Sequence, residues 1–170
     1  MPQSHIVTAF DQELDRLTSS IGAMGDFAGA QVTDAVRALL HGDTALARRV
    51  VDQDRQIDAL RRDLSASAAL VISKRQPLAG DLDEVLADFK IVEDLERIGD
   101  LAKNIAKRVG AVGDAAASRQ LANSIDTMAN MVLRQVHDVV EHYVARDAAA
   151  LQQLRADDEK IDVQYTSVFR

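Results

Sequence analysis

The residues best suited to chemistry in this chain are two pairs of carboxylates, each spaced four residues apart. Asp54 and Asp58 form the first pair, and Glu96 and Asp100 form the second. On a helix this spacing puts both members on one face, with Cβ atoms about 5–6 Å apart. Oxygen ligands without thiols or imidazoles suit hard cations. The pattern predicts a site for a divalent or trivalent metal ion, with Mg, Mn, Fe, Zn and Ca as the candidates.

The two pairs are also expected to meet. Pro77 marks a turn between the two segments that carry them. Asp58 and Glu96 each lie 19 residues from this turn, on opposite sides, and Asp54 and Asp100 each lie 23 residues from it. In an antiparallel helix pair, equal distances from the turn place residues at one level, because each residue adds the same rise. We therefore expect the four carboxylates to gather, and their mutual repulsion favours a bound cation.

A salt-bridged scaffold is the alternative reading of the same acids. With 28% charged residues in the chain, basic side chains can neutralise the acids without any metal. The candidates for this role are Arg55, Arg61, Arg97 and Lys103. The protein would then be a helical interaction protein that binds no ion. A metal-dependent hydrolase or redox site would need an open coordination position and a substrate pocket, and the sequence indicates neither.

The chain also repeats itself at a constant offset of 104 residues, which is typical of two copies of one structural unit. Asp54 and Asp58 fall on Asp158 and Asp162, so the first acidic pair has a counterpart. The positions that would match Glu96 and Asp100 lie beyond residue 170. The repeat therefore predicts a second metal site with only half of its ligands.

The elements that must position these acids are helices. Apolar residues recur every three or four positions, and the composition, with 47% apolar and 4% aromatic residues, is typical of a helical bundle. We predict an all-α fold of tandem three-helix bundles, the second lacking its last helix. The expected units are a first repeat over 1–110, a linker over 111–118 and an incomplete second repeat over 119–170. The expected helices cover about 5–40, 44–75, 81–109, 119–145 and 147–170.

Composition and motifs exclude several functions. The formal net charge of −7 and the absence of a basic stripe argue against nucleic-acid binding. No apolar run is long enough to cross a bilayer, and no secretory signal is visible, so we expect a cytoplasmic protein. The chain has no cysteine, no glycine-rich phosphate loop and no nucleophile elbow. No catalytic residue is predicted, and the protein is not expected to be an enzyme.

One stretch of the chain resembles a known family. The runs Asp81–Asp83, Asp94–Asp100 and Asn104–Ala106 are similar to the hallmark segment of the PhoU phosphate-uptake regulators. The resemblance implies two three-helix repeats with Glu/Asp-x-x-x-Asp motifs, and a dimeric, cytoplasmic regulator. It implies coupling of a phosphate ABC transporter, through its ATPase, to a sensor histidine kinase. It also implies metal ligation by the motif acids, which here are Asp54, Asp58, Glu96, Asp100, Asp158 and Asp162.

The chain departs from the family pattern at three places. Asp83 stands where the family usually has Arg, and Leu101 stands where it often has His or another polar residue. The third departure is the absence of a final helix with its own acidic motif. We expect the fourth and fifth helices to expose the apolar faces that this helix would cover, and such a face promotes self-association.

Overall fold

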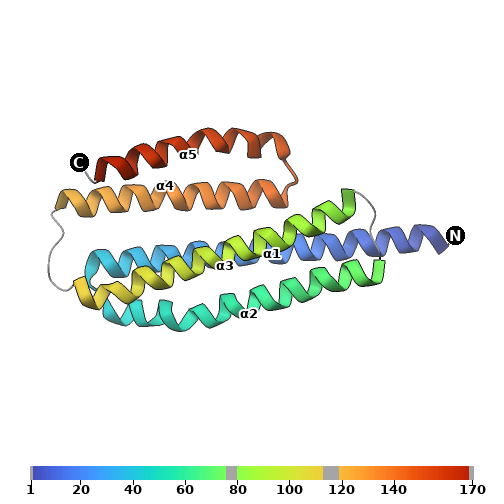
Figure 1. Cartoon of the computed structure of the whole chain (residues 1–170), viewed down its shortest axis with the longest axis horizontal. Helices are drawn as coiled ribbons and strands as arrows, with labels where there is room; N and C mark the ends of the chain where they lie inside the picture. The colour runs from blue at the N-terminus through green and yellow to red at the C-terminus, as the bar shows by residue number, and fades with distance from the viewer. Residues whose placement is uncertain (1, 76–79, 113–118, 169–170) are drawn as a thin grey trace.

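The computed structural model describes residues 2–75, 80–112 and 119–168, and in these ranges the chain forms five helices and no strand. The all-α prediction is confirmed. Each predicted helix is found to within a few residues; Pro77 and residues 113–118 of the predicted linker lie outside the described residues. Figure 1 shows the helices side by side along one long axis. They are α1 (Pro2–His41), α2 (Thr44–Arg75), α3 (Gly80–Val112), α4 (Arg119–Val144) and α5 (Ala148–Val168).

The first three helices form a bundle in which each helix contacts the other two. Apolar residues on α1 recur at helical spacing, and those at the centre of this stripe, such as Ile21 and Met24, are fully buried. Ile57 of α2 and Val92 of α3 pack against them in one cluster. Burying side chains of this size is worth about 1.5–3 kcal/mol each, which makes the stripe the main source of stability for the bundle.

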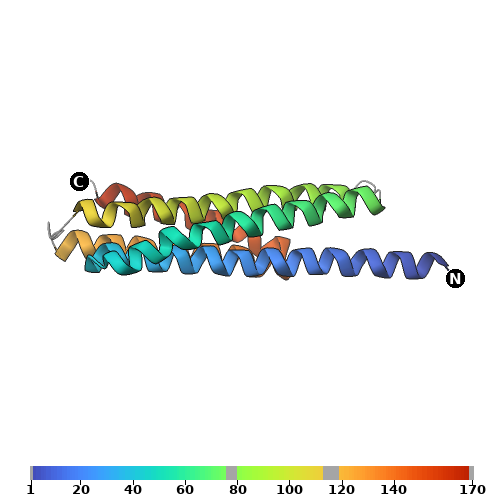
Figure 2. The same cartoon turned by 90° about the horizontal axis from the view of Figure 1, so that it is seen from below.

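The fourth helix packs against α1, and α5 packs against α4 alone among the described helices. Figures 1 and 2 show α4 running beside α1, with α5 on its outer side. Two glycines of α1 allow the close approach. A Cβ atom at Gly25 would lie 2.6 Å from a methyl group of Val140, and one at Gly22 would lie 2.9 Å from a methyl group of Val144. These glycines are therefore contact points for α4.

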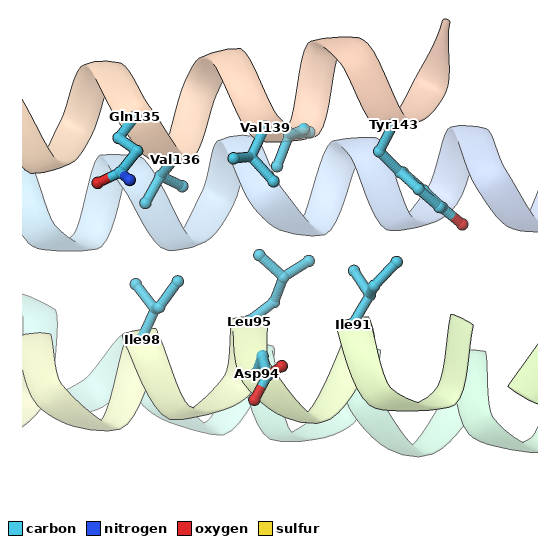
Figure 3. Close-up of a pocket in the computed structure, with 9 residues that line it drawn as sticks. Ile91, Asp94, Leu95, Ile98, Gln135, Val136, Val139 and Tyr143 are labelled. Carbon is cyan, nitrogen blue, oxygen red and sulfur yellow. The ribbon is translucent and has the colours of Figure 1, made fainter. Parts of the chain in front are cut away.

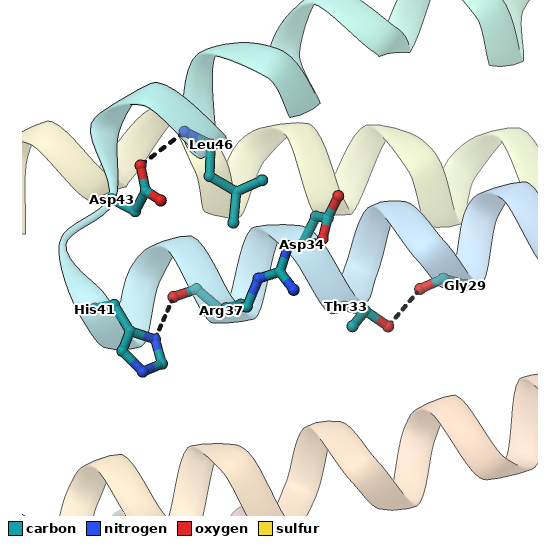
Figure 4. A network of polar contacts seen from close by, with 7 residues as sticks. All are labelled: Gly29, Thr33, Asp34, Arg37, His41, Asp43 and Leu46. Atoms are coloured by element: carbon teal, nitrogen blue, oxygen red, sulfur yellow. Dashed lines mark hydrogen bonds and ion pairs between the residues drawn. The ribbon is translucent and has the colours of Figure 1, made fainter.

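The turn between α1 and α2 is repeated between α4 and α5, 104 residues later. Gly42 and Arg146 both have a left-handed backbone, with φ of 64° and 56°. In both turns the next residue is an aspartate that caps the following helix. Asp43 Oδ1 accepts a hydrogen bond from Leu46 N at 2.8 Å, and Asp147 Oδ1 accepts one from Ala150 N at 3.0 Å. Figure 4 shows the first of these caps. Gly42 and Asp43 thus end the first helix and begin the second.

Apolar side chains of α3 and α4 face each other across an open groove of about 280 Å³. Figure 3 shows Ile91, Leu95 and Ile98 pointing from α3 towards α4. A second groove, between α4 and α5, shares Gln135 and Val139 with the first, so the uncovered strip is continuous across α4. Apolar residues are exposed on both of these helices, among them Val139 of α4 at 40% and Val163 of α5 at 71%. None of the described helices is long and apolar enough to cross a membrane.

Candidate metal centre

The first two acidic pairs lie where α2 packs against α3. Asp54 occupies a position in the apolar stripe of α2, between the fully buried Val50 and Ile57, and is itself only 9% exposed. Its neighbours in the motifs, Asp58, Glu96 and Asp100, are half-buried. The helical stripe therefore directs one carboxylate into the interface, and the others lie at its rim.

Lys103 joins the two motifs. Its Nζ donates a hydrogen bond to Asp54 Oδ2 at 2.7 Å and another to Asp100 Oδ1 at 2.5 Å. Both contacts are ion pairs, and the lysine side chain is 20% exposed. Asp54 of α2 and Asp100 of α3 are thus within reach of a single cation, in agreement with their equal distances from Pro77. Lys103 is one of the four basic residues that the salt-bridged alternative requires.

The other two acids share the same electrostatic environment. Burial raises the pKa of Glu96, and the negative charges of Asp100 and Asp58 raise it further. Arg61 opposes this rise in pKa, while also pairing with Glu93 at 3.2 Å. Like charges that lie close together disfavour the charged form of each acid, which is the direction of the shift at Glu96. Asp54 and Asp100 are joined by Lys103, and Asp58 and Glu96 are half-buried on the same two helices.

These acids do not close around one point in the structure. Over the described ranges 2–75, 80–112 and 119–168, the residues that bring three ligand atoms within 4.8 Å of one another are His137, Asp138 and Glu141 of α4. This cluster was not predicted from the sequence. His137 is exposed, and its Nε2 lies 3.8 Å from Glu141 Oε2. Exposed pairs of this type contribute little to stability.

The donor set at the α2–α3 interface fits a hard cation. Asp54 Oδ1 is buried and has no hydrogen-bond partner. Gln31 of α1 is 1% exposed, and both of its amide atoms also lack a partner. Its Oε1 reaches α3 inside the second motif, where it would lie 2.9 Å from a Cβ atom at Gly99. Buried polar atoms without partners cost about 1–3 kcal/mol each, and oxygen atoms of this kind are ligands for Mg²⁺, Mn²⁺ or Ca²⁺.

The third acidic pair is placed differently. Asp158 and Asp162 are exposed on α5 and line the groove between α4 and α5. Gln135 lines the same groove, and it corresponds to Gln31 at the repeat offset. Because α5 contacts only α4 among the described helices, no described helix supplies these two aspartates with acids comparable to Glu96 and Asp100.

A second polar site was missed by the sequence analysis. Asp88 of α3 is 1% exposed, and it accepts a hydrogen bond from the Tyr143 hydroxyl of α4. Burial raises the Asp88 pKa above its usual range, although the bond from Tyr143 and the charge of Arg146 oppose the rise. The only sequence signal was that Asp88 continues the buried stripe of Val85 and Val92.

A family model and the relatives of this chain carry the same family name. The PhoU domain family matches residues 21–109. A phosphate-specific transport system accessory protein PhoU homolog of Rhizobium meliloti is 43% identical over 170 residues, which is 100% of this chain and 72% of the relative. A homolog of the same description from Caulobacter vibrioides is 36% identical over 166 residues, which is 98% of this chain and 72% of the relative.

Two solved structures share the fold. The crystal structure of PhoU from Pseudomonas aeruginosa aligns with a TM-score of 0.87 at 30% identity, covering 95% of this chain and 77% of that one. The PhoU structure from Streptococcus pneumoniae, described as a phosphate transport system regulatory protein, aligns with a TM-score of 0.85 at 26% identity, covering 94% and 74%. Together with the family match, these similarities identify the chain as a member of the PhoU family of phosphate transport system regulatory and accessory proteins, which are not enzymes.

Proposed function

We propose that this chain is a cytoplasmic regulator of phosphate uptake and of phosphate-starvation signalling. It acts as a metal-binding helical adaptor between the ATPase of a phosphate ABC transporter and a sensor histidine kinase. The observation that carries the proposal is the similarity over the whole chain to a protein named as an accessory of the phosphate-specific transport system. We also propose that residues 1–110 and 119–170 are two copies of one unit joined by the segment 111–118, which the duplicated turn supports.

The metal part of the proposal rests on the acids at the α2–α3 interface. Asp54, Asp58, Glu96 and Asp100 would hold the ion in the first unit, and the pair Asp158 and Asp162 would offer a weaker site in the second. A bound cation would neutralise the crowded carboxylates and satisfy the free oxygen of Asp54. The salt-bridged alternative is favoured by one observation, which is that Lys103 already pairs with two of the acids.

Complementation tests the regulatory role. In a Rhizobium meliloti strain that lacks its own homolog, expression of this chain is expected to restore repression of a phosphate-starvation reporter in phosphate-rich medium. The relative's own gene serves as the positive control. A reporter that stays active, although the chain accumulates to the level of the relative, would reject the regulatory role.

An Asp54→Ala/Glu96→Ala double variant tests the metal part of the proposal. Elemental analysis of protein purified after Mn²⁺ supplementation should find about one ion per folded unmodified chain and far less in the double variant. Asp63→Ala, which removes an exposed acid of the same helix α2, is the matched control. Sub-stoichiometric metal in the unmodified chain would remove the metal claim and leave the adaptor role to be judged by complementation.

We further propose that two copies of the chain associate through the apolar strip over α3, α4 and α5. Val139 lines both grooves and is 40% exposed, so a charge at this position would disrupt a buried contact. Light scattering is expected to give the mass of a dimer for the unmodified chain and a shift towards the monomer for Val139→Lys. Leu70→Lys, at a 50% exposed position on α2, is the control that should leave the dimer intact. A monomeric unmodified chain at micromolar concentration would contradict self-association.

A further inference from the structure

The ammonium group of Lys103 occupies the space between the two acidic motifs. It contacts one oxygen of Asp54 on α2 and one oxygen of Asp100 on α3, at 2.7 and 2.5 Å. Hydrogen bonds between charged groups at such distances are the strong ones in proteins. Lys103 therefore holds two helices together through carboxylates that would otherwise repel each other.

A metal ion bridging the same two carboxylates would compete with this lysine. One oxygen of each aspartate is engaged by the ammonium group, and Asp54 Oδ1 remains buried without a partner. A divalent cation placed among these oxygens would lie within a few ångströms of the ammonium, and like charges at that separation repel strongly. A metal ion and the Lys103 ammonium group therefore cannot both bind the carboxylates of Asp54 and Asp100 as tightly as either would alone.

The lysine is able to leave. Its side chain is 20% exposed, and its four-carbon stem is flexible. The ammonium can rotate into water while the stem stays on the surface of α3. Arg61, another basic residue near these acids, is bound to Glu93 at 3.2 Å. Among the described residues, Lys103 is the cation that contacts both Asp54 and Asp100.

We propose that Lys103 is an internal cation that stabilises the metal-free protein and sets its metal affinity, because it must withdraw from Asp54 and Asp100 when a metal binds. The proposal rests on the proposed metal binding and adds the residue that controls it. Metal loading then exchanges an ion-paired lysine for a free ammonium group on the surface of α3, so the two states differ in a chemically detectable way.

The experiment is a titration of the full chain with Mn²⁺, followed by calorimetry, for the unmodified chain, Lys103→Met and Lys107→Met. Lys107 lies one turn further along α3 and is exposed, which makes it the matched control. Lys103→Met is expected to bind Mn²⁺ about ten-fold more tightly or better, which is a gain of about 1.4 kcal/mol. Without metal it should unfold at a lower temperature than the unmodified chain, and Mn²⁺ should reverse this loss. Lys107→Met should match the unmodified chain in both measurements.

Amine labelling supplies a second readout in the unmodified chain. An ion-paired ammonium reacts slowly with an acylating reagent, so labelling of Lys103, measured by mass spectrometry, should rise with Mn²⁺ concentration. Labelling of Lys107 should stay constant. This measurement needs no substitution, and it decides the matter if Lys103→Met does not fold.

The outcomes separate the proposed metal binding from the proposed role of Lys103. If neither the unmodified chain nor Lys103→Met binds Mn²⁺ saturably, the proposed metal function fails. If both bind it with equal affinity, and Mn²⁺ leaves the labelling of Lys103 unchanged, metal binding stands and the role of Lys103 is rejected. Tighter binding by Lys103→Met, together with metal-dependent labelling of Lys103, supports both.

Discussion

Gly25→Ala is expected to lower the free energy of unfolding by about 1–2 kcal/mol, although alanine is the better helix former by about 1 kcal/mol. The new Cβ atom would lie 2.6 and 3.0 Å from the two methyl groups of Val140 and 3.3 Å from its Cβ. A β-branched side chain has one strongly preferred rotamer in a helix, so Val140 cannot turn away. The variant must therefore push α4 away from α1, and denaturant unfolding followed by circular dichroism measures the loss.

Gly29→Ala is the matched control on the same helix, four residues further on. A Cβ atom at Gly29 would meet nothing within 4 Å, so only the gain in helix propensity remains. This variant should be more stable than the unmodified chain by about 0.5–1 kcal/mol. The same substitution is thus expected to act in opposite directions at two neighbouring glycines. Equal effects of both substitutions would show that α4 does not pack on α1 at Val140.

The buried Asp88 is expected to make stability fall as pH rises. Its folded-state pKa is raised, so between its ordinary pKa near 3.9 and the raised value the folded chain binds more protons than the unfolded chain. The stability that Asp88 contributes is therefore complete below about pH 4 and is lost as the pH rises through the folded-state pKa. Glu84 adds to this rise in pKa and Arg146 opposes it, while Tyr143 donates its hydroxyl to the carboxylate.

Asp88→Asn tests this dependence, because an amide oxygen still accepts the bond from Tyr143 and carries no charge. The second carboxylate oxygen of Asp88 is buried without a partner, so removing its charge should stabilise the protein at pH 7 by on the order of 1 kcal/mol. The gain should disappear near pH 4. Asp94→Asn, at an exposed position of the same helix, should give no such pH dependence. Urea unfolding across pH 4–8 measures both variants, and a gain independent of pH would contradict the assignment.

Much of this fold could be predicted from local rules. Val50, Ile57 and Leu64 recur at helical spacing and form the buried face of α2, and Gly42 and Asp43 are residue types typical of the turn before it. Distances along the chain also placed Asp54 opposite Asp100 correctly, because the rise per residue of a helix is constant. Hydrophobic period and capping chemistry are properties of neighbouring residues, so a single sequence contains them.

The details of the site depend on contacts between distant segments, and these could not be predicted. Spacing identified Lys103 only as one of four basic candidates, since its choice of partners depends on side-chain rotamers. Asp88 meets Tyr143 across 55 positions of sequence, and neither residue stands out within its own helix. Gly22 and Gly25 are poor helix formers, and nothing in that segment reveals that α4 approaches α1 there.

The duplicated turn has a consequence for how the two halves of the protein are attached to each other. Gly42 adopts its left-handed backbone at almost no energetic cost, whereas Arg146 adopts it at a cost of roughly 1–2 kcal/mol. In exchange, the guanidinium of Arg146 lies 2.9 Å from Glu84 and 3.5 Å from Asp15, both in the first bundle. The first hairpin bends at a glycine, whereas the second bends at an arginine that also forms ion pairs with the first bundle. A substitution at position 146 would thus weaken the attachment of the second hairpin to the first bundle, whereas a substitution at position 42 would strain the turn of the first hairpin.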